Sequence, residues 1–371
     1  MAHSKPGRII VCNGYKDPEY VRLALVGQKL GLKVYIVIEK PGELETVLRE
    51  SQALKVRPLL GVRVRLASTG SGNWQNTGGE RGKFGLSAGQ LISFCERLQK
   101  VGLNENLQLL HFHMGSQISA LADMERGLRE ASRYLVEMAG LGFQLQVVDV
   151  GGGLGVDYEG THSRSACSIS YSLEDYAGII VKTLAEACDQ AGLPVPEIFT
   201  ESGRAMTAHH AVLLSNVIDI ERMSAGHPDL SRETDSPFVA ALIRLLDTQG
   251  PGAEQRYREA QSIMAEFYAA YNRADASLEL RALIEQYYLA LLRSVSDQLD
   301  PEMPSQRELQ DQINQRLADK LFCNFSVFQS VPDVWGLAQV FPIMPLQRLD
   351  ERPARRAVIQ DLTCDSDGHI E

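Results

Sequence analysis

Hydrophobic and polar positions follow two alternating patterns along roughly the first 200 residues. Short apolar runs rich in β-branched residues predict buried strands, and longer stretches with apolar positions every three or four residues predict amphipathic helices. Six strands are expected, at residues 9–12, 33–38, 58–66, 107–112, 147–150 and 197–200. Five helices are expected between them, at residues 18–30, 41–54, 87–101, 120–141 and 173–191. This alternation predicts an α/β fold with a parallel sheet, either open or closed into a barrel.

The strand count bears on which of these two sheets forms. A closed (β/α)8 barrel has eight strands, and its phosphate site often follows strands 7 and 8. A glycine run at 151–153 and a charged turn at 201–204 end the last two predicted units. If these units are strands 7 and 8, the fold is a (β/α)8-type barrel that lacks its first two strands. We therefore expect the chain to be the central part of a longer protein.

The pattern changes after residue 211, where β-prone residues at 212–220 are followed by a long helical stretch. That stretch predicts an inserted bundle of about three helices, whose apolar stripes we assign to core or oligomer packing. Strand patterns return at 325–328 and 357–363. The expected segments are a partial barrel at 1–210, the start of a β domain at 211–236, the inserted bundle at 237–321, and truncated β-domain strands at 322–371.

Composition narrows the class of partner and compartment. The net charge is −10, from 37 basic and 47 acidic residues, which argues against nucleic acid as the main partner. No apolar run approaches the roughly 18 residues of a membrane span, so no membrane partner is expected. The six cysteines form no C-x-x-C pair. They predict reduced thiols and a cytoplasmic protein.

The glycine run Gly151–Gly153 follows the apolar strand at 147–150. Glycines at the carboxyl end of a parallel strand let backbone N–H groups approach a phosphate closely. The spacing fails the dinucleotide fingerprint, because Val156 and Tyr158 stand where glycine is needed, and no P-loop is present. A tight strand-to-helix turn without a ligand is the alternative interpretation.

Other candidate side chains stand at the ends of predicted strands. Alternation places His111 and His113 on one face of their strand, with Ser116 just beyond. An imidazole there could stack on a flat cofactor ring, and a serine hydroxyl could bind a phosphate oxygen. A structural histidine is the competing interpretation.

A carboxylate and a guanidinium, Glu201 and Arg204, stand three residues apart in the 201–204 turn, and Arg65 is expected to face the same mouth. Such a pair suits a ligand that is phosphorylated and also basic at a ring nitrogen. A surface ion pair is the alternative.

Cys364 and Asp365 lie at the end of the strand pattern at 357–363. A buried cysteine is usually inert packing. One at a strand end beside Asp365 and Asp367 is a better candidate for an exposed proton donor.

Together these segments resemble the pyridoxal-phosphate decarboxylases of the ornithine, diaminopimelate and arginine group, which are built on an alanine-racemase-like barrel, and the arginine branch resembles the chain most. The motifs extend over nearly the whole chain. They are IIVCNGYKD (9–17), GSGNWQ (70–75), KFGL (83–86), HFHMGSQ (111–117), DVGGGLGVDY (149–158), TESGRA (200–205), NFSVFQSVPD (324–333) and DLTCDSDG (361–368).

The resemblance implies pyridoxal 5'-phosphate as cofactor and a role for each matching residue. His113 would stack on the pyridoxal ring, and Glu201 would pair with the ring nitrogen. Cys364 would donate a proton to the product carbanion, and Asp365 would hold the cationic tail of the substrate. The phosphate ligands implied are Gly151, Gly152, Gly153, Ser116 and Arg204, with Arg65 at the same mouth. Residues that flank the glycine run would line the substrate site: Val148, Asp149, Val150, Leu154, Gly155, Val156, Asp157 and Tyr158.

The implied reaction is decarboxylation of L-arginine to agmatine and carbon dioxide, in polyamine biosynthesis. The resemblance further implies a homo-oligomer with shared active sites, and magnesium, for which the sequence offers no recognisable carboxylate cluster. The family's Schiff-base lysine lies in a Lys-x-Asn setting that is not found here, since Lys83 belongs to KFG and Lys16 follows a strand and its turn. We therefore expect this chain to be inactive alone. The alternatives are a non-catalytic relative that binds partner subunits, or a related diamino-acid decarboxylase.

Overall fold

The computed structural model describes residues 3–68, 82–223, 235–246, 252–300, 302–353 and 355–371. The chain forms two compact units, and each is described by itself. The first comprises Met1–Val212 with Val340–Pro342, and the second comprises Leu213–Gln339 with Ile343–Glu371. The GSGNWQ motif at 70–75 lies outside the described residues.

The first unit contains one parallel sheet of six strands in sequential order. The strands are β1 (Ile9–Cys12), β2 (Lys33–Ile38), β3 (Leu59–Arg63), β4 (Leu107–His111), β5 (Val147–Asp149) and β6 (Glu197–Phe199). All five neighbouring pairs are parallel, so the six parallel strands predicted from the sequence are confirmed. Within the described residues β1 and β6 are the edges of this curled sheet. The two further strands of a complete barrel stay a prediction.

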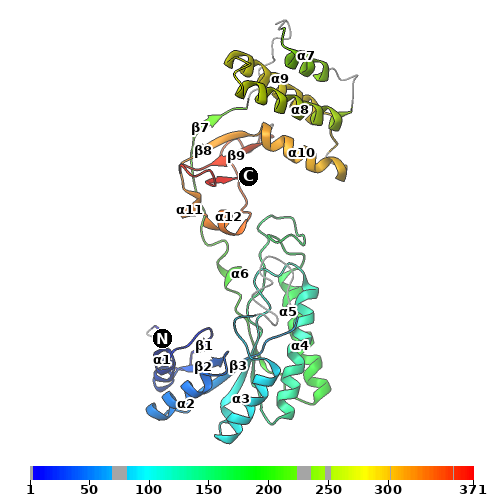
Figure 1. The fold of residues 1–371 in the computed structure, drawn as a ribbon. Helices are drawn as coiled ribbons and strands as arrows, with labels where there is room; N and C mark the ends of the chain where they lie inside the picture. The colour runs from blue at the N-terminus through cyan, green and yellow to red at the C-terminus, as the bar shows by residue number, and fades with distance from the viewer. Residues whose placement is uncertain (1–2, 69–81, 224–234, 247–251, 301, 354) are drawn as a thin grey trace. The chain divides into compact units, whose positions relative to one another are not determined.

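Helices follow the strands in the first unit (Figure 1). They are α1 (Pro18–Lys29), α2 (Glu43–Leu54), α3 (Ala88–Lys100), α4 (Leu121–Gly140), α5 (Leu173–Ala191) and the short α6 (Gly203–Thr207), with a 3₁₀ turn at Asn104–Asn106. Several of these helices begin at residues whose side chains cap the first turn. The Asp17 side chain accepts from the Tyr20 N–H ahead of Pro18, and Ser87 and Ser172 each form a capping box.

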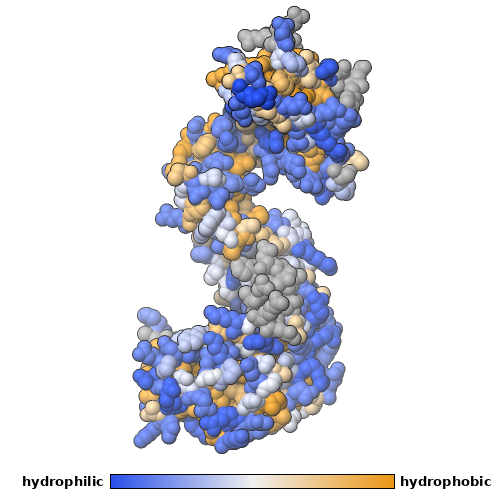
Figure 2. Space-filling model, in the orientation of Figure 1, coloured by the Kyte–Doolittle hydropathy of each residue, from blue (hydrophilic) through white to orange (hydrophobic). Residues whose placement is uncertain are grey.

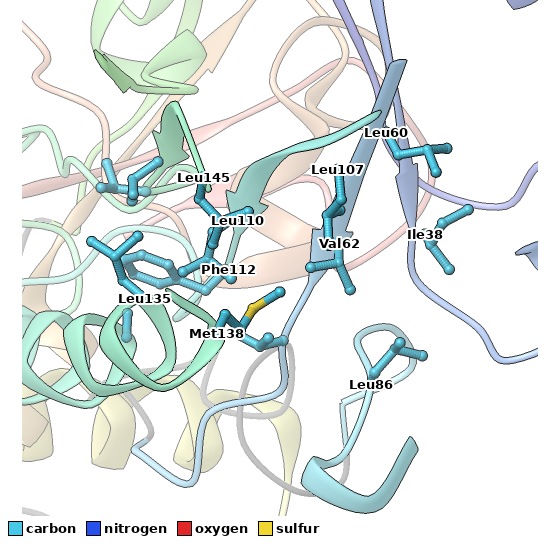
Figure 3. Close-up of a cluster of buried hydrophobic side chains, with 14 of the residues drawn as sticks. Ile38, Leu60, Val62, Leu86, Leu107, Leu110, Phe112, Leu135, Met138 and Leu145 are labelled. Carbon is cyan, nitrogen blue, oxygen red and sulfur yellow. The ribbon is translucent and has the colours of Figure 1, made fainter. Parts of the chain in front are cut away.

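The main core lies between the sheet and its helices, because alternate strand residues point to the helix side. Figure 3 shows Leu60 and Val62 of β3 and Leu110 of β4 in one apolar cluster with Leu135 and Met138 of α4. The visible outer surface of this unit is mostly hydrophilic in Figure 2, with scattered apolar residues. A smaller apolar layer fills the inner face of the sheet, formed by Tyr35, Val37, Leu109 and Val147.

The second unit contains a four-stranded sheet in the order β10-β9-β8-β7. Its strands are β7 (Val217–Glu221), β8 (Asp319–Cys323), β9 (Ala357–Gln360) and β10 (His369–Ile370). The β8–β9 pair is parallel and the other two pairs are antiparallel.

Two strand predictions in this unit need correction. The segment 325–328 was predicted as a strand, but it leads into α11 (Val327–Ser330), where the Val327 N–H donates to the Asp361 carboxylate at 2.8 Å. The strand is instead β8, whose residues 319–321 lie in the stretch predicted to be helical, because a short apolar run does not distinguish strand from helix. The strand predicted at 357–363 ends at Gln360, since the Asp361 carboxylate accepts from the backbone of Thr363 and turns the chain. The helix α12 (Pro332–Leu337) follows α11.

The inserted bundle has four helices within the described residues, not about three. They are α7 (Pro237–Leu246), α8 (Ala253–Asn272), α9 (Leu278–Ser296) and α10 (Pro304–Leu317). Its core includes Phe267, Tyr287 and Leu291, so the predicted apolar stripes are core residues. Among the described helices of either unit, none is long and apolar enough to cross a membrane.

A buried arginine ties three bundle helices together. Arg256 of α8 is fully buried and donates to the Leu245 carbonyl at 2.7 Å, the Gln298 amide oxygen at 2.8 Å and the Ser294 hydroxyl at 2.8 Å. We expect Arg256→Met to lower the free energy of unfolding by about 3 kcal/mol, because buried acceptors lose their donor. Urea unfolding monitored by circular dichroism measures this change. Arg258→Met, on the same helix but exposed and 3.5 Å from Glu254, is the control and should cost at most about 0.5 kcal/mol. Equal losses in the two variants would contradict the prediction.

Candidate functional site

Three neighbouring strands carry candidate residues just beyond their carboxyl ends. The chain after β4 leads to His113, the chain after β5 forms the glycine turn, and the chain after β6 leads to Glu201. The Gly152 N–H donates to His113 Nδ1 at 3.3 Å, and the Glu201 N–H donates to the Gly151 carbonyl at 2.9 Å. These three segments therefore share one mouth, which we call the strand-end mouth.

The turn at 151–153 requires glycine. Gly151 has φ +68° and Gly153 has φ +118°, in a region that residues with a Cβ seldom adopt. A Cβ on Gly151 would lie 2.4 Å from the Phe112 carbonyl oxygen, and one on Gly153 would lie 2.8 Å from Ile118 Cδ1. The Asp149 carboxylate accepts from the Gly151 N–H at 2.9 Å. Within the described residues the Gly153 N–H has no hydrogen-bond partner, so it is available to a ligand.

A guanidinium stands beside this turn. Arg204 donates to the Ser116 hydroxyl from Nη2 at 3.0 Å and from Nε at 3.2 Å, and from Nη1 to the Tyr158 hydroxyl at 3.0 Å. Arg204 comes from α6 and Ser116 from the loop after β4, so the two predicted phosphate ligands meet. A positive charge, a hydroxyl and a backbone N–H make a suitable anion site.

The Glu201 carboxylate also belongs to the strand-end mouth. Although it reaches solvent, the surrounding protein raises its pKa, mainly through partial burial and then through the negative charge of Asp149. The charges of His111 and Arg63 act in the opposite direction. The side-chain amide of Asn13, after β1, donates to the same carboxylate.

The imidazole of His113 is neutral over most of the pH range. Burial, followed by the charges of Arg63 and His111, lowers its pKa to about 4. Because Nδ1 accepts from Gly152, the ring proton of the neutral form is on Nε2. A neutral, flat and half-buried ring can stack on a cofactor without opposing its positive charge.

This lowered pKa predicts a pH dependence of stability. A folded-state pKa below the unfolded value of about 6.5 stabilises the fold above pH 6.5, and this contribution is lost as the pH falls towards 4. From pH 7 to 4.5 the first unit should lose about 2 to 3 kcal/mol through His113. Urea unfolding at both pH values should show a smaller loss in His113→Gln. An unchanged loss in this variant would contradict the assignment.

One layer below the mouth lies a row of polar residues that the sequence analysis left without a role, apart from Asp149. It contains Glu39, Arg63, His111 and Asp149 on adjacent strands. Strand alternation could have identified Arg63, which points to the same face as Arg65. The Arg65 guanidinium itself donates to the Gly85 carbonyl at 2.9 Å.

Several residues predicted to line the substrate site have buried side chains, and their substrate role stays a prediction. The side chains of Val148, Val150 and Leu154 are buried in the main core. Val156 and Tyr158 pack in a separate apolar cluster, although the Tyr158 hydroxyl reaches Arg204.

Two further members of this set have structural roles. The Asp157 carboxylate accepts from the Gly160 and His162 N–H groups and so orders its own loop. A Cβ on Gly155 would lie 2.5 Å from Ile169 Cγ2, so the residue packs tightly. Asp149 alone of the eight faces the mouth with its carboxylate, and Tyr158 touches the phosphate ligand Arg204.

Cys364 and Asp365 belong to the second unit, where both are exposed. The Asp365 carboxylate accepts from the Asp367 N–H at 3.0 Å and its carbonyl from the Gly368 N–H at 3.1 Å. The two residues lie in a turn between β9 and β10 and are open to a ligand.

A magnesium site is not assigned. In the described part of the chain, His111, Asp149 and Glu201 are the group whose potential ligand atoms lie within 4.8 Å of one another. Mg²⁺ prefers oxygen ligands and keeps several waters, whereas this group offers an imidazole, the buried carboxylate of Asp149 and the exposed carboxylate of Glu201. The group does not fit magnesium and belongs instead to the strand-end mouth.

Comparisons with known proteins agree with this geometry. Residues 1–208 match the family of pyridoxal-dependent decarboxylases in its pyridoxal-binding domain, and residues 232–314 match the arginine decarboxylase helical bundle domain. The biosynthetic arginine decarboxylase of Alkalilimnicola ehrlichii is 52% identical over 375 residues, covering 100% of this chain and 59% of the relative. That of Pseudomonas aeruginosa is 51% identical, covering 100% and 58%. This chain therefore spans less than two thirds of these relatives.

A solved structure is also similar to this chain along its whole length. The crystal structure of the biosynthetic arginine decarboxylase of Campylobacter jejuni has a TM-score of 0.79 and 29% identity, covering 100% of this chain and 58% of that one. The parallel sheet of six strands and the match of residues 1–208 identify the first unit as a pyridoxal-binding domain of this type. The chain belongs to the pyridoxal-dependent decarboxylase family, and it is similar along its whole length to biosynthetic arginine decarboxylases.

The residues at the strand-end mouth fit pyridoxal phosphate. Arg204, Ser116 and the Gly153 N–H would hold the phosphate, and the narrow turn at 151–153 leaves no room for a Cβ at two of its three positions. His113 would lie against the ring, and Glu201 would accept from the ring nitrogen. Bound there, the cofactor supplies an electron sink for the bond that breaks.

Proposed function

We propose that this chain takes part in the decarboxylation of L-arginine to agmatine and carbon dioxide with pyridoxal phosphate. The observation that carries the proposal is the convergence of the glycine turn, the Arg204–Ser116 pair and Glu201 on one mouth. The arginine substrate is supported by relatives that are 51–52% identical and named biosynthetic arginine decarboxylase. Those names also favour a place in polyamine biosynthesis.

Each residue of the first unit has a distinct task in this proposal. Arg204 and Ser116 neutralise and orient the phosphate, and the glycine turn lets the backbone approach it. The Glu201 carboxylate accepts a hydrogen bond from the protonated ring nitrogen, so that the proton stays on the nitrogen. The neutral His113 fixes the plane of the ring and excludes water from one side.

The remaining tasks fall to the second unit. Cys364 donates the proton that replaces the lost carboxylate, and the Asp365 carboxylate pairs with the guanidinium of the substrate. We propose that these residues act in the site of a neighbouring subunit, so that a homo-oligomer is the active form, and that the enzyme works in the cytoplasm. Magnesium is implied by the family resemblance alone, and we propose no site for it.

A chimera tests the proposal. Residues 1–371 replace the matching segment of the Pseudomonas aeruginosa relative, and agmatine is measured by chromatography with arginine, ornithine or lysine as substrate. We expect arginine to be preferred. Glu201→Gln should lower kcat by roughly a hundredfold or more, because the ring nitrogen loses its ionised partner. A folded chimera that binds the cofactor but prefers ornithine would contradict the substrate assignment.

The shared site has a separate test in the same chimera. Cys364→Ala subunits mixed with Glu201→Gln subunits should regain part of the activity, because some mixed sites contain both native residues. No recovery in mixed oligomers would count against sharing.

A further inference from the structure

Four charged or titratable side chains form a row across the inner face of the sheet. Arg63 ends β3, His111 ends β4 and Asp149 ends β5, and their Cα atoms are direct register partners. Glu39 follows the last residue of β2, next to Arg63. We call these residues the strand-end row. They lie above the inner apolar layer and below the mouth.

The row is buried and internally paired. Glu39 Oε1 lies 3.4 Å from Arg63 Nη1, with side chains 0% and 12% exposed. His111 Nδ1 lies 3.4 Å from Asp149 Oδ2, with both side chains 1% exposed. Buried ion pairs are a costly way to stabilise a fold, since apolar residues of equal volume do as well or better. We therefore infer that the strand-end row has a role other than stabilising the fold.

The row faces both ring-binding residues. Burial, followed by the charge of Asp149, raises the pKa of Glu201, whereas the charges of His111 and Arg63 lower it. Burial, followed by the charges of Arg63 and His111, lowers the pKa of His113, and the charge of Asp149 raises it. Among the described residues, the neutral Asn13 amide also contacts Glu201, and Tyr176 of α5 lies near Asp149.

Each of two neighbouring carboxylates disfavours the ionised form of the other. Carboxylate oxygens of Asp149 and Glu201 lie within 4.8 Å of each other. A second negative charge at this distance raises the pKa of a carboxyl group, and a nearby cation opposes that effect. A guanidinium keeps its charge at every physiological pH, whereas an imidazole does not. Arg63 is the member of the row with that property.

We propose that Arg63, held in place by Glu39, is a positioning residue that favours the ionised form of Glu201 and the neutral form of His113, so that the mouth is set in advance for a cofactor with a protonated ring nitrogen. This inference rests on the proposed function for the identity of the cofactor. Its electrostatic part does not, because both residues titrate without any ligand.

The primary variant is Arg63→Gln, whose amide can still donate to Glu39 and so supports folding. In the free 371-residue chain, an NMR titration should show the midpoint of His113 protonation about one pH unit higher in this variant. The His113 signal is identified as the one that is missing in His113→Gln. Binding of pyridoxal phosphate, followed by fluorescence, should weaken as the pH falls. We call this fall in affinity the acidic limb of the pH profile. It should lie about one pH unit higher in Arg63→Gln, so that Kd at a given pH on the limb is roughly tenfold larger.

Two further variants separate charge from structure. Arg63→Lys keeps the charge and should restore most of the native limb. Glu39→Gln leaves the Arg63 charge uncompensated and should move the limb in the opposite direction, to lower pH. A merely structural role would weaken binding equally at every pH and would give no opposite shift. Arg57→Gln, just before β3 and exposed, is the control and should leave the limb in place.

The outcomes distinguish this inference from the proposed function. If Arg63→Gln binds pyridoxal phosphate as the native chain does, with the acidic limb and the His113 titration unchanged, the role of Arg63 is overturned. The proposed function would then remain intact. A shifted His113 titration in a chain that binds no pyridoxal phosphate would support the electrostatic role and count against the proposed cofactor.

Discussion

Replacing Gly151 with alanine is expected to lower the free energy of unfolding by about 2 to 5 kcal/mol and to weaken binding of pyridoxal phosphate at least roughly tenfold. Two effects add. The backbone has φ +68°, which costs about 1 to 2 kcal/mol for a residue with a Cβ. The new Cβ would also lie 2.4 Å from the Phe112 carbonyl oxygen, which belongs to the backbone and cannot rotate away.

A matched control separates these two effects. Gly192 at the end of α5 has φ +64°, but an added Cβ would meet no atom within 4 Å. Gly192→Ala should therefore cost only about 1 kcal/mol and leave cofactor binding unchanged. Urea unfolding and fluorescence titration of both variants give the comparison. Equal losses of stability would show that strain alone, and not close packing of the turn, requires glycine at position 151.

The loss of binding has its own cause. The Gly151 carbonyl accepts from Glu201 and its N–H donates to Asp149, so a displaced Gly151 would move the groups expected to hold both ends of the cofactor. The turn therefore links the phosphate end of the site to its ring end. Restoring the fold with a stabilising substitution elsewhere should not restore binding.

The strands and helices of the first unit could be predicted because their signals are local. Asp17 with Pro18, and the capping boxes at Ser87 and Ser172, mark helix starts in the sequence itself. The position of a residue at a strand end was enough to group His113, Gly151 and Glu201, since parallel strands end at one edge.

The strand-end row could not be predicted in the same way. The pairing of Arg63 with Glu39 depends on the register between β2 and β3, which a single sequence does not reveal. The error at 325–328 has a similar origin, because the Asp361 carboxylate that binds the Val327 N–H comes from 34 residues further along. The substrate role predicted for Val148 and Val150 stays a prediction. A motif covers a continuous stretch of sequence, whereas alternate side chains of a strand point to opposite faces. At these two positions the side chains point into the core.

The 371-residue polypeptide by itself is expected to make no detectable agmatine and to form no borohydride-stable link between a lysine and pyridoxal. Decarboxylases of this kind need an amine that first joins the cofactor and is then displaced by the substrate. Among the described lysines, the Lys16 amine is buried, donates to the Gly14 carbonyl at 2.5 Å and lies 3.4 Å from Glu43. The amines of Lys40 and Lys83 lie over the Phe84 ring, at 5.2 Å from its centroid.

None of the described lysines hydrogen-bonds to the glycine turn, His113 or Glu201, so no amine is positioned at the mouth. The chain should still bind the cofactor reversibly through Arg204 and Ser116, and Arg204→Ala should weaken that binding by roughly ten- to a hundredfold, because a charge-assisted pair is lost. The link between a lysine and pyridoxal is measured by borohydride treatment with mass spectrometry. Decarboxylation is measured by the release of labelled carbon dioxide from arginine. The chimera with flanking segments from the Pseudomonas aeruginosa relative is the positive control and should give both the link and the product. Turnover by the isolated chain, or one specifically labelled lysine within it, would show that the nucleophile lies among these residues and that its amine moves into the mouth when the cofactor binds.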